Sequence, residues 1–146
     1  MQTLAQFRYA VRQFLQFSEQ RALAAGLQPQ QHQLMLQIAG APAGVETTVS
    51  YIAERLGLRH HSVVELSKRC EVAGLIHREQ AETDRRCTVL TLTPLGRQVI
   101  LALSEDHERE LSELVPTLIH SLTQIRRHDA NPRALIKTGN EAKHLY

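Results

Sequence analysis

Residues 49–69, VSYIAERLGLRHHSVVELSKR, decide the fold that the sequence predicts. Gly57 divides the stretch into two amphipathic segments, and glycine ends helices readily because it adopts left-handed backbone conformations at little cost. Ala53 is small at the point where a second helix would approach the first closely. Apolar side chains are placed to fill the angle between the segments, at Ile52, Leu56, Leu58, Val63 and Leu66. The pattern therefore predicts two helices joined by a tight turn. An ordinary αα-hairpin with a glycine turn would share only one or two of these features.

The second of these helices has two distinct faces. Val63, Leu66, Cys70 and Ala73 recur at helical spacing, which predicts that they face the core. The other face carries mostly polar residues, namely His60, His61, Ser62, Val64, Glu65, Lys68 and Arg69. If this helix enters a major groove, these side chains can reach base edges or phosphates. Taken alone, such a face is equally consistent with a solvated surface.

The stretch AETDRRCTVLTLTPLG, residues 81–96, interrupts the helical periodicity. Residues 74–79 and 87–92 read as two short strands, with a polar tip over 80–86. A hairpin directly after a helix-turn-helix forms a wing, whose tip can carry Arg85 and Arg86 into a narrow, electronegative minor groove. Asp84 can pair with a neighbouring arginine and fix the tip. The alternation therefore predicts a DNA-contacting wing.

Helical patterns flank this region on both sides. Apolar spacing predicts a first helix over 3–25, and Pro29 and Gly40 suit the start and end of a second. Thr93 is a good N-cap for a long helix that runs to Ile125, and a last helix is expected from Pro132 to about His144. The fold class predicted is mainly α with a small β-hairpin (α+β), a winged helix-turn-helix with an added helical region.

Composition limits the class of protein without naming its partner. The chain has 146 residues, 42% of them hydrophobic and 22% charged, as in an ordinary globular protein. Its net charge is only +2, so a nucleic-acid interface must come from the placement of charges. Two cysteines are too few for a disulfide scaffold and suit a reducing cytosol. Arg8 and Arg12 lie inside the first apolar pattern, which argues against a secretory signal or membrane span. We therefore expect a cytoplasmic location.

The motifs AGLIHRE and TDRRCTVLTLTPLG, following the helix-turn-helix, resemble the winged-helix regulators of the MarR family. That family shows R-G-L-V at the end of a helix, a D-R-R wing, and L-T-x-x-G opening a long helix. LQPQQHQLML, residues 27–36, is similar to its second-helix pattern. The specific match covers about residues 27–97. Gln28 stands where the family usually has Thr or Ser, His32 replaces an aromatic residue, and Glu65 replaces an arginine that often reads guanine.

The resemblance implies a bacterial transcription regulator, expected to be a repressor, that binds a near-palindromic operator as a homodimer. It implies a single unit over 1–146, with the DNA-binding region at 27–97 and helical dimerisation regions at 1–25 and 98–146. Many members release DNA on binding a small, often phenolic, effector. The resemblance places such a site near Arg12, His32 and Tyr51, where His32 would titrate near neutral pH. Alternatively, His32 simply caps the second helix.

Glu65 allows two interpretations. Ser62 and Glu65 could form a capping box at the start of the second helix-turn-helix helix. Alternatively the helix begins earlier, near His60, and Glu65 faces the groove, where it accepts a hydrogen bond from a cytosine amino group. The family's helix start favours the earlier beginning.

Other kinds of site are poorly supported by the sequence. His107 and Glu110 are the best local metal-binding candidates, but exposed helix surface is the better interpretation, and we expect no metal and no cofactor. Cys70 lies on an apolar stripe, while Cys87 opens a wing strand and is the better candidate for exposure or redox sensing. The alternatives to a DNA-binding regulator are a winged-helix module that binds protein and a small enzyme. No catalytic constellation is visible, so we expect no enzyme.

Overall fold

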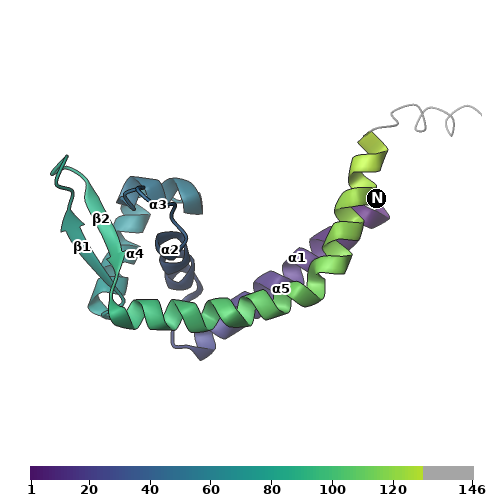
Figure 1. Ribbon diagram of the computed structural model, residues 1–146, viewed down its shortest axis with the longest axis horizontal. Helices are drawn as coiled ribbons and strands as arrows, with labels where there is room; N and C mark the ends of the chain where they lie inside the picture. Colours follow the sequence, from purple (N-terminus) through teal and green to yellow (C-terminus); the bar gives the residue numbers. More distant parts are fainter. Residues whose placement is uncertain (130–146) are drawn as a thin grey trace, which may run out of the picture. The chain divides into compact units, whose positions relative to one another are not determined.

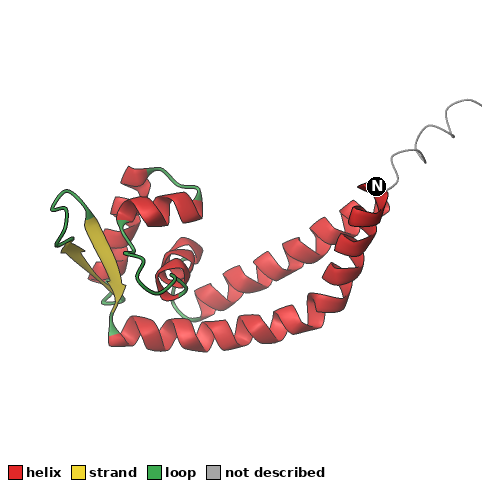
Figure 2. Cartoon of the chain, turned by 45° about the horizontal axis from the view of Figure 1, so that its top comes forward, coloured by secondary structure: helices red, strands yellow, loops and turns green. Residues whose placement is uncertain are grey.

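The computed structural model describes residues 1–129, so the helix expected over 132–144 lies outside the described residues. The elements follow in the order α1 (Gln2–Ala24), α2 (Pro29–Ala39), α3 (Val49–Leu56), α4 (His60–Val72), β1 (Ile76–Gln80), β2 (Thr88–Leu92) and α5 (Pro94–Asp129) (Figure 1). Helices dominate, and the two strands form one antiparallel hairpin (Figure 2). The fold class predicted from the sequence is confirmed.

The chain divides into two compact units. One unit contains Gln16–Arg109 and holds the last part of α1, the helix-turn-helix, the hairpin and the first part of α5. The other contains Met1–Leu15 and, among the described residues, the part of α5 from Glu110 onward. None of the described helices is both long enough and apolar enough to cross a membrane.

The helix-turn-helix forms as the sequence predicts. Thr48 caps α3, and its Oγ1 accepts a hydrogen bond from the Tyr51 amide at 3.1 Å. Gly57 ends α3 with φ 63°, a left-handed conformation that other residues adopt only with strain. Val63, Leu66 and Cys70 of α4 are buried as expected. Ala73 is exposed instead, because α4 ends at Val72 and its inward stripe does not extend further.

The hairpin is anchored to the rest of its unit along β2. Ile76 pairs with Leu92 at its base and Gln80 with Thr88 at its outer end. The Leu90 amide donates to the Thr47 carbonyl at 2.9 Å, so the segment before α3 lies along β2. Leu90 and Ile76 are almost fully buried and join the core beside Val63. This anchoring fixes the base of the hairpin and leaves its tip at the surface.

The start of α5 is fixed against the base of the hairpin. Thr93 is buried, its Oγ1 accepts from the Gly96 amide at 3.0 Å, and its hydroxyl donates to the Gly74 carbonyl at 2.7 Å. The Thr93 amide also donates to the Leu75 carbonyl at 3.0 Å. Gly96 lies directly on this carbonyl, and a Cβ at position 96 would come within 2.0 Å of the Leu75 oxygen. The expected N-cap is confirmed, and the glycine three residues later allows the close approach.

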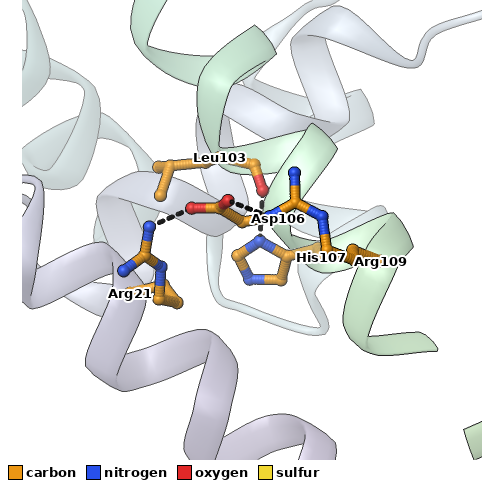
Figure 3. A network of polar contacts seen from close by, with 5 residues as sticks. All are labelled: Arg21, Leu103, Asp106, His107 and Arg109. Atoms are coloured by element: carbon orange, nitrogen blue, oxygen red, sulfur yellow. Dashed lines mark hydrogen bonds and ion pairs between the residues drawn. The ribbon is translucent and has the colours of Figure 1, made fainter. Parts of the chain in front are cut away.

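A polar core of histidines joins α1, α2 and α5 inside the larger unit. His107 is buried, and its Nε2 lies 2.8 Å from the Ser18 hydroxyl. Its Nδ1 bonds the Leu103 carbonyl (Figure 3). Because a carbonyl only accepts, Nδ1 is the donor in its bond with Leu103. The His32 ring lies 4.8 Å from the His107 ring. The expectation that His107 lies on exposed helix surface is therefore wrong, because α1 and α2 cover it.

The described residues of the smaller unit bury little of their apolar surface. Of its described residues, Ala10 and Ser121 are buried. Large apolar side chains are exposed on both of its helical segments, namely Met1, Leu4, Tyr9, Leu15, Val115, Ile119 and Leu122. A surface of this kind is typical of a protein–protein interface.

Candidate nucleic-acid interface

The outward face of α4 carries the polar residues that the sequence places there. His60, His61, Glu65, Lys68 and Arg69 are exposed, and Ser62 is partly exposed. Val64 is partly buried and packs against the core, so it contributes less to this face than expected. One helix therefore presents two histidines, a serine and two cations to solvent.

Glu65 does not cap α4. The helix begins at His60 with Arg59 as its N-cap, so Ser62 lies within the first turn and the capping-box interpretation is wrong. The Glu65 carboxylate instead accepts from Lys68 Nζ at 3.0 Å. That hydrogen bond, followed by the positive charges of Lys68, Arg69 and Arg78, holds the pKa of Glu65 below its ordinary value. The carboxylate thus stays ionised within a group of three cations.

The tip of the hairpin is ordered by Asp84. Its Oδ1 accepts from the Arg86 amide at 3.0 Å and from Arg86 Nε at 3.1 Å. These bonds lower the pKa of the Asp84 carboxyl. The Arg86 side chain remains 91% exposed, and Arg85 beside it is exposed as well. Asp84 therefore orients an arginine without burying it, as the sequence predicts.

Arg78 is a cation beside this face that the sequence reasoning missed. It lies on β1, and its Nε is buried without a hydrogen-bond partner among the described residues. Its alternation with exposed His77 and Glu79 places it on the hairpin's inner face. That pattern was visible in the sequence, but a charged residue at an inward position is easily attributed to solvent.

The residues expected around an effector do not form one site within a single unit. Arg12 belongs to the smaller unit, and His32 and Tyr51 belong to the larger one. His32 is buried within α2, whose N-cap is Gln28, so His32 is not the capping residue. Burial, and then the nearby His107, lower the pKa of His32 from 6.5 to about 4. The expectation that it titrates near neutral pH is therefore wrong.

The cysteines differ in environment as the sequence predicts. Cys70 is buried, and burial raises the pKa of its thiol to about 11, which disfavours the reactive thiolate. Cys87 is partly exposed, and its Sγ lies 3.8 Å from Asp84 Oδ2. Redox sensing by Cys87 stays a prediction. Within residues 1–129, no group of three or more His, Cys, Asp or Glu side chains is arranged to hold a metal ion.

Comparison with known proteins agrees with this geometry. The model of the MarR family matches residues 25–86, which span the second helix through the wing tip. Over these residues the chain is similar to the MarR family. The MarR resemblance predicted from the sequence is thereby confirmed. No curated protein matches the chain significantly.

Solved MarR-family structures share the fold over most of the chain. AbsC, a MarR-family transcriptional regulator from Streptomyces coelicolor, is 20% identical with a TM-score of 0.66, covering 90% of this chain and 88% of its own. CouR from Rhodococcus jostii bound to p-coumaroyl-CoA is 17% identical with a TM-score of 0.65, covering 85% of each chain. MepR from S. aureus in complex with DNA is 22% identical with a TM-score of 0.66, covering 90% of this chain and 94% of its own. At these identities the likeness establishes the winged-helix fold.

Proposed function

We propose that this protein is a DNA-binding transcription regulator of the MarR type. The observation that carries the proposal is the pairing, in one compact unit, of an exposed polar α4 face with a wing tip whose Arg86 is oriented by Asp84. His60, His61, Ser62, Glu65, Lys68 and Arg69 are the residues that meet the major groove, and Arg85 and Arg86 enter the minor groove. MepR, which shares the fold, has been solved in complex with DNA.

The regulator acts as a homodimer on a near-palindromic operator. The described residues of the smaller unit expose seven large apolar side chains, more than a soluble monomer usually leaves uncovered. A second copy of this chain is the simplest cover, and two-fold symmetry then presents two α4 helices to two half-sites. Binding across a promoter blocks transcription, so we propose a repressor.

A binding experiment on the promoter beside the protein's own gene tests the function. We expect the parent protein to bind this duplex in a fluorescence anisotropy titration. Arg86→Ala should weaken binding to this duplex and to an unrelated one alike, by about tenfold, and reduce the salt slope by about one phosphate contact. Arg109→Ala is the matched control, because Arg109 is also exposed and also pairs with an aspartate, Asp106 at 3.4 Å, but lies on α5. Equal affinity of Arg86→Ala and parent at moderate salt would remove the wing from the interface.

The homodimer predicts a defined mass in solution. One chain has a mass of 16.5 kDa, and multi-angle light scattering of the full chain at micromolar concentration should give twice this mass. Its unfolding midpoint should rise with protomer concentration, because association stabilises only the folded state. A monomeric mass with a concentration-independent midpoint would rule out the dimer and the palindromic operator.

We also propose that a small aromatic effector regulates DNA binding. Pockets of about 300–1,000 Å³ suit small ligands, and Phe7, Arg8, Val11, Arg12 and Leu15 line one of about 360 Å³ in the smaller unit. Its two arginines and its aromatic residue match an aromatic acid, in line with the expected role of Arg12. CouR, which has the same fold, has been solved with p-coumaroyl-CoA. A panel of aromatic acids that leaves the DNA complex unchanged would count against this regulation.

Binding of protein by the winged helix is the competing function. Glu65 and the low net charge favour it, since a carboxylate facing DNA phosphates costs affinity. The exposed arginines at the wing tip favour DNA instead. Failure of the parent protein to bind any duplex at low salt would make the protein-binding function the better proposal.

A further inference from the structure

The seam between α4 and the wing contains a cation that the DNA-binding face described above does not use. Arg78 lies on β1 opposite Leu90 of β2, and Leu90 is fully buried. Paired residues on neighbouring antiparallel strands direct their side chains to the same face. Arg78 therefore leaves the hairpin on its inner side, toward the elements that the hairpin covers.

A backbone contact ties Arg78 to α4. The Arg78 amide donates to Glu71 Oε2 at 3.0 Å, and Glu71 lies in the last turn of α4. The two elements that would contact DNA are thus joined at this residue. The position of Arg78 along the seam is fixed by its backbone, whatever its side chain does.

The Arg78 side chain is incompletely satisfied. Its Nε is buried and meets no acceptor within residues 1–129. A buried N–H without an acceptor costs about 1–3 kcal/mol. Movement of the guanidinium toward an anion at the surface would remove this cost and form charge-assisted hydrogen bonds.

The positive charge of Arg78 acts on a carboxylate of the exposed face of α4. The pKa of Glu65 is lowered first by its bond with Lys68 and further by Arg69 and Arg78. Glu65 is exposed and bonded to Lys68 Nζ at 3.0 Å. In the free protein this carboxylate is the local counterion of the cations at the seam.

A phosphate chain separates the major groove from the adjacent minor groove in duplex DNA. With α4 in one groove and the wing in the other, this chain passes over the seam between them. We propose that Arg78 binds a phosphodiester of that chain, and that the phosphate replaces Glu65 as the counterion of the seam. The inference rests on the proposed DNA-binding function and adds a phosphate subsite to it.

The subsite predicts opposite effects for two substitutions. Arg78→Gln removes a phosphate contact, so affinity for all duplexes should fall by about tenfold and the salt slope should decrease by about one. Glu65→Gln removes a charge that repels the phosphate, so affinity for unrelated DNA should rise severalfold. Arg78→Lys keeps a positive charge but loses the planar fork, and should bind with intermediate affinity.

Anisotropy titrations at several salt concentrations, on the promoter duplex and an unrelated duplex, test the inference. Arg109→Gln is the control for loss of an exposed arginine, and thermal melting of each variant checks folding. If Arg78→Gln is unstable, the other two variants still test the inference: Arg78→Lys should bind DNA more weakly than the parent, and Glu65→Gln should bind unrelated DNA more tightly. Parent-like affinity and salt slope in Arg78→Gln, together with weaker binding by Arg86→Ala, would overturn this inference alone. Absence of DNA binding by the parent would overturn the proposed function and the subsite together.

Discussion

Gly96→Ala should destabilise the protein by about 3 kcal/mol or more, which corresponds to a fall in Tm of about 10 °C. The added Cβ would lie 2.0 Å from the Leu75 carbonyl oxygen and 3.0 Å from its carbon. Neither atom can move easily, because this carbonyl accepts the Thr93 amide at the start of α5. Relief of the clash therefore requires α5 to separate from the base of the wing.

Gly44→Ala is the matched control for this substitution. Gly44 has φ 80°, but a Cβ there meets nothing within 4 Å, so only backbone strain of about 1–2 kcal/mol is expected. Urea unfolding of both variants at one protomer concentration separates steric clash from strain. A Gly96→Ala protein as stable as Gly44→Ala would mean that α5 does not rest on Leu75.

Local signals were sufficient to predict the winged helix-turn-helix region. Gly57 and Thr93 act through the backbone geometry of their own turn or helix end, which short motifs encode. Asp84 and Arg86 interact across two residues, so the ordered wing tip also followed from neighbouring residues. Such features depend little on the rest of the chain.

The sequence patterns did not predict features that arise from tertiary packing. His107 lies in the polar run EDHERE, and only contact with Ser18 of α1 and His32 of α2 buries it. Arg78 was missed for the same reason, since its inward direction depends on pairing with Leu90. The choice between the two roles of Glu65 depends on the residue at which α4 begins. The two roles require starts that differ by only two or three residues, and sequence patterns do not locate a helix start that accurately.

The buried histidines predict a loss of stability on mild acidification. His32 is 2% exposed and packs against His107, so protonation would place a charge in a buried site next to a second imidazole. These effects lower its pKa from 6.5 to about 4 in the folded protein. Between these values the unfolded chain binds more protons than the folded one. Stability is therefore complete above about pH 6.5 and declines as the pH falls toward 4.

The size of this decline and its source can be measured together. Each pKa unit corresponds to about 1.4 kcal/mol, so the shift of His32 sets a loss of up to about 3 kcal/mol by pH 4. Urea unfolding near neutral pH and near pH 4, at fixed protomer concentration, should show this loss in the parent.

His32→Leu carries no proton at this site and should show a smaller difference between the two pH values, whatever its stability at neutral pH. His77→Leu removes an exposed histidine of β1 and should retain the full difference. The lowered pKa values of Glu65, Asp84 and Asp106 act at lower pH and are common to all three proteins, so they do not affect the comparison. Equal pH dependence in His32→Leu and the parent would show that acid acts on this fold through groups other than the histidine core.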